Sequence, residues 1–175
     1  IPTGVIGILF KDTVELAGTM LIVPGICLLI TSVFLVIADY ADEGTKRPRE
    51  ASYVNAGLIG VAQGIATMPG LSRSGTTITA CLLCGFEKKF AVKYSFIMSI
   101  PAVLGAVVLE LKDVAKAPLQ ASAVPACAVA TVISAIVGYL SICIMMRLIQ
   151  GKKYKIFAVY CAIVGLITVG YGIFR

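Results

Sequence analysis

The chain has 175 residues, of which 59% are hydrophobic and 14% are charged. A soluble domain usually has about 45–50% apolar and about 25% charged residues, so the composition excludes an ordinary soluble domain and predicts one multi-pass membrane domain. The net charge of +6 would suggest nucleic acid in a soluble protein. Here the basic residues gather in short loops, where they set membrane orientation, and we exclude nucleic acid as a partner.

The opening segment, residues 1–10, reads as the end of a helix whose start is absent, because the chain begins with Ile1 and not Met. We therefore expect a fragment that is truncated at its N-terminus. Long uncharged runs follow, and a membrane-spanning helix needs about 20 such residues. These runs are 20–38, 51–72, 94–109, 117–146 and 156–174.

The elements that we expect alternate between apolar helices and charged loops. A Pro24-Gly25 kink in the second helix is tolerated because neighbouring helices can satisfy the freed backbone groups. In chain order we predict a helix end at 1–10, a helix at 20–38, a charged loop at 39–51, a hairpin at 53–86, a spanning helix at 88–109, a polar loop at 110–120, and spans at 121–147 and 154–174.

The hairpin prediction comes from the positive-inside rule. The loops 39–51 and 86–93 are both basic, so both are expected on the cytoplasmic side. The segment between them then crosses twice or not at all, and its second arm, 76–86, is too short to cross. We predict a re-entrant helix-loop-helix that breaks at "MPGLSRSG", where irregular backbone is tolerated only if it is buried in protein or lines a wet cavity.

The first arm of this hairpin carries a stripe of small and polar residues on one helical face. One interpretation is close packing against another helix. The other is that Gln63 points into the same cavity as the loop, and both can hold. The stripe consists of Gly57, Gly60, Gln63, Gly64 and Thr67.

The loop itself contains Arg73, with no acidic residue between Glu50 and Glu87. An arginine at membrane depth costs at least about 2.5–3.5 kcal/mol, so something must offset that cost. One alternative is a carboxylate from elsewhere in the bundle. The other, which we favour, is a bound anion, because a guanidinium matches two phosphate oxygens.

The residues around Arg73 suit an anion. Gly70 follows a proline that breaks the first arm, and Gly75 lets the backbone approach a ligand. Ser74 or Thr76 can cap the second arm and leave its N-terminal N–H groups facing the ligand. Further hydroxyl donors are Ser72 and Thr77.

Other phosphate chemistries are excluded by motifs that the sequence lacks. There is no GxxxxGK[ST] loop, no Cys-x5-Arg loop and no histidine. The six cysteines lie in apolar runs, and Cys81 and Cys84 form a lone CxxC without a second ligand pair, so we expect no zinc site there.

The loop resembles the signature PGxSRSxxT of the undecaprenyl-pyrophosphate phosphatase family, also called bacitracin-resistance proteins. "IPTGVIGILF", "YSFIMSIPAVLGA" and "KIFAVY" also resemble family segments, so the likeness covers nearly all 175 residues as a C-terminal portion. The matching signature residues are Pro69, Gly70, Ser72, Arg73, Ser74 and Thr77.

The resemblance implies an all-α polytopic membrane bundle, half of an inverted-repeat fold. It implies an enzyme that hydrolyses a C55 polyprenyl pyrophosphate to the monophosphate plus phosphate, recycling the peptidoglycan carrier and giving bacitracin resistance. The site would face the outer side of the bacterial plasma membrane. A divalent cation, Mg²⁺ or Ca²⁺, would bind to ligands of a glutamate-containing motif upstream of Ile1. The expected partners are the polyprenyl pyrophosphate lipid and the membrane, with a homodimer as an option.

By this resemblance Arg73 clamps phosphate, with Ser72 and Ser74 as catalytic residues. The substrate-binding residues would be Gly70, Gly75, Thr76, Thr77 and Gln63. Family members often carry arginine where this chain has Cys161, so a role for that arginine is in doubt here. Two alternatives stay open: a transporter or flippase of a phosphorylated lipid, whose broken helices look alike, and an inert remnant.

Overall fold

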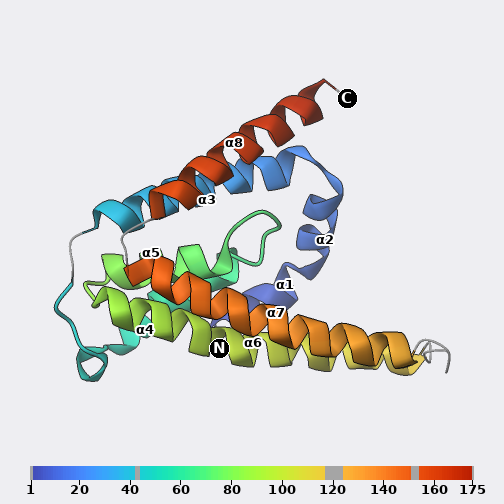
Figure 1. Cartoon of the computed structure of the whole chain (residues 1–175), viewed down its shortest axis with the longest axis horizontal. Coiled ribbons are helices and arrows are strands. Elements are labelled where there is room, and N and C mark those ends of the chain that lie inside the picture. The colour runs from blue at the N-terminus through green and yellow to red at the C-terminus, as the bar shows by residue number, and fades with distance from the viewer. Residues whose placement is uncertain (1, 42–43, 117–123, 151–153, 175) are drawn as a thin grey trace.

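The computed structural model describes residues 2–41, 44–116, 124–150 and 154–174, and in these ranges the chain is helical with no β-strand (Figure 1). This confirms the predicted all-α class. The elements are α1 (Pro2–Leu9), α2 (Lys11–Thr19), α3 (Ile22–Tyr40), the 3-10 turn η1 (Pro48–Glu50), α4 (Tyr53–Ile65), α5 (Arg73–Leu83), α6 (Lys88–Lys116), α7 (Val124–Gln150) and α8 (Tyr154–Ile173).

Four helices are long and apolar enough to cross a membrane, which confirms the polytopic membrane bundle. They are α3, the Lys88–Val108 part of α6, the Val124–Ile144 part of α7, and α8. Their outer surfaces carry many exposed large apolar side chains, such as Val132 and Ile136 on α7. Such surfaces are stable against lipid and not against water.

Several boundaries differ from the sequence prediction. The second arm of the hairpin, predicted at 76–86, is α5 at Arg73–Leu83. The span predicted at 121–147 is α7 at Val124–Gln150, and 121–123 lie outside the described residues. Residues 110–116, predicted as loop, extend α6, because they contain neither glycine nor proline to end the helix. The rest of that loop, 117–120, lies outside the described residues. Residues 11–19 form α2, which the sequence analysis did not predict. The loop 39–51 is shorter than expected, because α3 continues to Tyr40 and η1 follows.

Helices α3 and α8 lie side by side along most of their length (Figure 1). Glycines make this close approach possible. A Cβ added at Gly25 would lie 2.7 Å from Val169 Cγ2, and one added at Gly165 would lie 3.0 Å from the Gly25 carbonyl oxygen. Ser32 also donates to the Ala158 carbonyl at 2.8 Å. The Pro24-Gly25 step is therefore a packing site for α8.

Helix α1 packs against α4 and confirms the packing interpretation of the small-residue stripe. A Cβ at Gly60 would lie 3.3 Å from Pro2, and one at Gly64 would lie 2.6 Å from Ile6. Thr3 Oγ1 donates to the Gly60 carbonyl at 2.9 Å. The stripe does not act as a whole, since the position of a Cβ at Gly57 is open.

Helices α4 and α5 pack against each other and are joined by the loop 66–72. They have 13 and 11 residues, which corresponds to about 20 and about 17 Å at 1.5 Å per residue. Both are shorter than a hydrocarbon core of about 30 Å. Together with α3, α6 and α8 they form the buried core, in which Ile78, Cys81 and Phe86 are almost fully enclosed.

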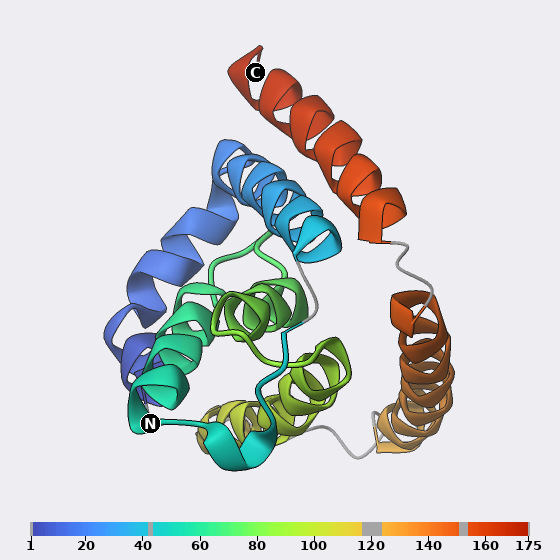
Figure 2. The same ribbon diagram turned by 90° about the vertical axis from the view of Figure 1, so that its left-hand side faces the viewer.

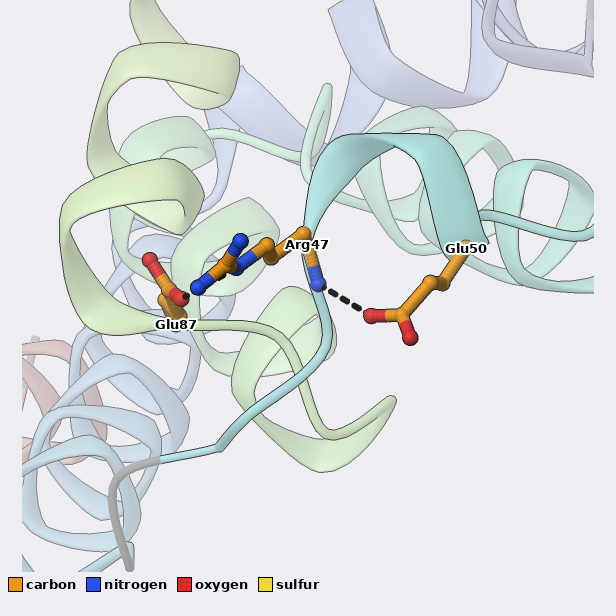
Figure 3. Close-up of polar contacts among 3 residues, drawn as sticks. All are labelled: Arg47, Glu50 and Glu87. Atoms are coloured by element: carbon orange, nitrogen blue, oxygen red, sulfur yellow. Dashed lines mark hydrogen bonds and ion pairs between the residues drawn. The ribbon is translucent and has the colours of Figure 1, made fainter.

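The two ends of the α4–α5 pair farthest from this loop meet at one place. The Lys46 N–H donates to the Gly85 carbonyl at 3.0 Å, and the Glu87 N–H donates to the Lys46 carbonyl at 3.3 Å. Beside this backbone bridge, Arg47 faces Glu87 at 4.0 Å and its N–H donates to Glu50 at 2.7 Å (Figure 3). The chain entering α4 is thereby tied to the chain leaving α5.

Helix α7 stands to one side of the other helices (Figure 2). None of the hydropathic window Val124–Ile144 is buried within the chain. Its apolar surface is therefore available to lipid or to other protein, while the packed part of the molecule is made by α1 to α6 and α8.

Candidate functional site

The site is built on the loop 66–72, which reverses the chain between α4 and α5. A run of tight turns follows α4, in which Thr67 N–H donates to Gly64 and Leu71 N–H donates to Met68. Gly70 has φ +89°, a conformation that favours glycine. A Cβ there would also collide with the Pro24 carbonyl oxygen of α3. The loop therefore needs glycine at this position for two separate reasons.

Ser72 begins the second arm. Its Oγ accepts a hydrogen bond from the Gly75 N–H at 3.1 Å, and it has the extended backbone of an N-cap residue. This corrects the expectation that Ser74 or Thr76 caps the arm, because both lie inside the first turn of α5. A Cβ at Gly75 would lie 3.0 Å from Ser72 Oγ, so glycine here leaves room for the cap.

Arg73 is the first residue of α5 and is partly exposed. Among the side chains that the structure describes, no carboxylate oxygen lies within 4.0 Å of its guanidinium, since the ion pairs found there are Lys11–Glu15 and Arg47–Glu87. The alternative of a structural carboxylate partner therefore gains no support from these residues. The charge lies next to the N-terminus of α5, where backbone N–H groups and the helix dipole add positive potential.

The remaining predicted site residues divide into two groups. Ser74 and Thr76 have no side-chain hydrogen bond among the described residues, and Thr76 Oγ1 is buried. Thr77 and Gln63 are both almost fully buried and face each other, with 3.5 Å between Thr77 Oγ1 and Gln63 Oε1. Thr77 Oγ1 also donates to the Arg73 carbonyl at 2.8 Å.

Helix α6 closes the other side of this network. Gln63 Nε2 lies 3.5 Å from the Met98 carbonyl, and Ser95 Oγ lies 3.5 Å from the Ser74 carbonyl. The structure therefore gathers all eight predicted residues around one loop and helix start. Gln63 and Thr77 have protein partners, and Thr77 bonds to the Arg73 carbonyl, so these two residues contact the backbone of Arg73 directly or through each other. Direct contact of these two with substrate stays a prediction.

The C-terminus of helix α5 is also capped by hydrogen bonds. Gly85 has φ +84°, its N–H donates to Leu82, and the Phe86 N–H donates to Cys81. These two bonds form a Schellman motif, with Phe86 buried against the last turn. The Cys81 and Cys84 pair thus belongs to a helix end. In the described part of the chain, no three His, Cys, Asp or Glu side chains gather as metal ligands.

Sequence reasoning missed two contributions from α3, the Pro24 carbonyl against Gly70 and the Thr31 hydroxyl against Gly70 and Ser72. A threonine in an apolar helix carries no signal that it binds a loop some forty residues away in sequence. Ser72 could have been found, because a serine directly before a helical pattern is a strong N-cap signal.

The fold and the site define a class of protein: a polytopic helical membrane protein in which a pair of short helices holds an arginine at a helix N-terminus. The model of the family BacA, bacitracin resistance protein BacA, matches residues 1–167. The chain belongs to this family.

Curated relatives agree with the family. The chain is 42% identical over 171 residues to the undecaprenyl-diphosphatase of Methanosphaera stadtmanae, covering 97% of this chain and 60% of that protein. It is 43% identical over 170 residues to the undecaprenyl-diphosphatase of Methanobrevibacter smithii, covering 96% of this chain and 60% of that protein. It is 39% identical over 169 residues to the undecaprenyl-diphosphatase of Halothermothrix orenii, covering 97% of this chain and 65% of that protein. The chain therefore spans about three fifths of the length of these relatives.

Proposed function

We propose that this chain contributes the arginine-bearing part of an undecaprenyl-pyrophosphate phosphatase. Such an enzyme removes the terminal phosphate of a polyprenyl pyrophosphate and leaves the lipid monophosphate. The observation that carries the proposal is Arg73: a partly exposed guanidinium at the start of α5, with no carboxylate beside it in the described ranges. The family and the names of its relatives support the same activity.

In this proposal Arg73 acts electrostatically, by stabilising negative charge on the phosphate oxygens. A water oxygen forms a bond to the terminal phosphorus and gives up a proton to solvent, while the bond from that phosphorus to the bridging oxygen breaks. If a serine hydroxyl attacks first, it loses its proton and becomes phosphoserine, which water then hydrolyses to serine and phosphate. The bridging oxygen leaves with the lipid monophosphate. Negative charge spreads over the equatorial oxygens, and such reactions depend mostly on positioning and charge stabilisation. The fork of Arg73 and the first N–H groups of α5 are donors that suit these oxygens.

The hydroxyl groups around Arg73 take different roles in this proposal. Ser72 Oγ already accepts the Gly75 N–H, so its lone pair caps the helix and its proton can still be donated. The Ser74 hydroxyl has no hydrogen-bond partner in the part of the chain that the structure describes and lies next to Arg73 in sequence, which suits contact with phosphate. Thr76 has a buried hydroxyl without a protein partner among the described residues. We expect the Ser72 and Ser74 hydroxyls to donate to the phosphate oxygens, and direct contact of the buried Thr76 hydroxyl with substrate stays a prediction.

A divalent cation, Mg²⁺ or Ca²⁺, remains part of the proposal on the strength of the resemblance. The residues that the structure describes do not fit it, because they contain no cluster of three metal-ligating side chains. We therefore route no step through a cation here. Chelation of the full-length enzyme, followed by readdition of Mg²⁺ or Ca²⁺, tests this requirement directly.

We also propose that α4 and α5 form a re-entrant pair in the plasma membrane, with the loop 66–72 toward the outer side. The two ends of the pair that lie farthest from this loop meet at the Lys46–Phe86 bridge. This bridge lies next to the basic residues that favour the cytoplasmic face. If α4 runs along the membrane normal, its length of about 20 Å carries the loop past the middle of a core of about 30 Å.

The test uses purified full-length protein in detergent with undecaprenyl pyrophosphate as substrate. We expect the unsubstituted protein to release phosphate and Arg73→Ala to lose most of that activity while keeping its helical content and melting temperature. The matched control is Arg49→Ala, an exposed arginine in η1 that should release phosphate normally. Near-normal release by Arg73→Ala would reject the clamp.

The same assay separates the phosphatase from a lipid transporter. Detergent micelles offer no second compartment, so a transporter would release no phosphate. Absence of phosphate release from folded full-length protein that still binds the lipid would favour the transporter and count against the proposed activity.

A further inference from the structure

We infer that Thr31 of α3 is a positioning residue for Arg73, acting through the backbone of the loop 66–72. Its side chain is only 1% exposed, in the middle of a candidate membrane span. Thr31 Oγ1 accepts a hydrogen bond from the Ser72 N–H at 2.9 Å and donates one to the Gly70 carbonyl at 3.2 Å. One hydroxyl thus uses both its donor and an acceptor position on the last turn before Arg73.

The first of these bonds replaces one that a helix start often makes for itself. In a capping box, the third helical residue is glutamate or glutamine, and its side chain accepts the N–H of the N-cap residue. Here the third residue is Gly75, which has no side chain, and a larger one would crowd Ser72 Oγ. The Ser72 N–H therefore needs an acceptor from outside α5, and Thr31 supplies it.

A second contact from α3 fixes the same loop. The Pro24 carbonyl lies directly against Gly70, whose positive φ turns the backbone toward Thr31. Gly70 and Ser72 flank Leu71, so α3 holds the loop at two points immediately before the arginine. A displacement of about 1 Å in a group that positions a substrate can lower a rate about a hundredfold. The direction in which Arg73 leaves the helix is therefore set from α3.

The test rests on the proposed function and compares Thr31→Val with Thr31→Ser in full-length protein. Valine keeps the shape but removes both hydrogen bonds, whereas serine keeps the hydroxyl. We expect kcat for phosphate release to fall about tenfold or more in Thr31→Val with a smaller change in KM, and to stay within about twofold in Thr31→Ser. Thr31→Ala, which cannot overpack the site, should show the same fall in kcat, and it replaces the valine variant in the test if that variant folds poorly.

The matched control is Thr79→Val. Thr79 also joins α5 to α3. Its hydroxyl lies 3.0 Å from the Phe34 carbonyl of α3 and 2.8 Å from the Gly75 carbonyl within α5, and it makes no hydrogen bond to the loop 66–72. A general loss of α3–α5 packing would lower the activity of both variants alike. Equal activity losses in Thr31→Val and Thr79→Val, or a loss in Thr31→Val that only follows its melting temperature, would overturn the inference.

Hydrogen exchange keeps this test separate from the activity. Thr31→Val should speed amide exchange in a peptide covering residues 69–75, and Thr31→Ser and Thr79→Val should not. If the unsubstituted enzyme releases no phosphate, the proposed function fails, while exchange still decides whether Thr31 holds the loop. Unchanged exchange in Thr31→Val would overturn the positioning role whatever the activity.

Discussion

At the scale of single residues, the structure separates the parts of a short motif that face outward from the parts that hold them. Arg73 and Ser74 have side chains without protein partners in the described ranges, whereas Ser72 and Thr77 are bonded to the backbone of their own helix. The motif therefore combines two side chains that have no protein partner among the described residues with a helix start that fixes their backbone.

The shape of the Arg73 side chain is expected to matter as well as its charge. Arg73→Lys keeps one positive charge but cannot offer two parallel N–H donors. Loss of one charge-assisted hydrogen bond costs about 1.5–3 kcal/mol, which corresponds to roughly a ten- to hundredfold lower kcat/KM. Steady-state phosphate release from full-length protein measures this, and a lysine variant with full activity would show that a point charge suffices.

The sequence predicted much of this site at residue level but not its supports. PGxSRSxxT marks the loop, and the uncharged surroundings of Arg73 pointed to an anion. The choice of cap was wrong, because three hydroxyl residues lie within five positions and only the backbone geometry selects Ser72. Thr31 could not be predicted, since its function depends on how α3 packs and not on its neighbours in the chain.

At the scale of elements, glycines determine which helices approach closely. The stripe on α4 receives Pro2 and Ile6 of α1, and Gly25 and Gly165 allow α3 and α8 to pack tightly. A pattern of small residues predicts that some helix packs there. The pattern does not identify which helix packs there, so α1 could not be predicted as the partner of α4. Helix α2 was a separate omission of the sequence prediction.

Two glycines of α8 give a matched test of this packing. Gly165→Ala places a methyl group 2.9 Å from Leu29 Cδ2 and 3.0 Å from the Gly25 carbonyl, and such overpacking typically costs about 1–3 kcal/mol. At Gly170 nothing lies within 4 Å of an added Cβ, so Gly170→Ala should leave stability unchanged or raise it slightly.

The measurement is the thermal unfolding midpoint of the two variants in the same detergent. We expect a lower midpoint for Gly165→Ala only. Equal midpoints would mean that α3 and α8 can separate without cost, and the tight crossing would then not stabilise the molecule.

At the scale of the whole molecule, the helices place both connections of the α4–α5 pair on one side. Helix lengths and the basic loops predicted such an arrangement from the sequence, and α4 and α5 are indeed shorter than a bilayer core. Composition could not predict the backbone bridge between Lys46 and Phe86, because β-bridge contacts of single residues leave no periodic pattern.

Labelling of single cysteines tests the re-entrant proposal. In a version whose six native cysteines are replaced, cysteines at positions 49 and 89 should react with an impermeant reagent from the same face of a sealed vesicle. A cysteine at position 124, the exposed first residue of α7, should react from the opposite face, because α6 is long and apolar enough to cross the membrane before it. Labelling of positions 49 and 89 from opposite faces would contradict the re-entrant pair.

The backbone bridge at the base of the pair has an evolutionary consequence. Its two backbone hydrogen bonds use main-chain atoms of Lys46, Gly85 and Glu87, and Lys46 Nζ adds a bond to the Cys84 carbonyl at 3.0 Å. The side chains of Arg47 and Glu87 can therefore be exchanged to suit membranes of different lipid charge without breaking these bonds. The constraint falls instead on Gly44, where an added methyl group would collide with the Gly85 carbonyl. Variation among relatives should accordingly spare this glycine while the charged residues beside it drift.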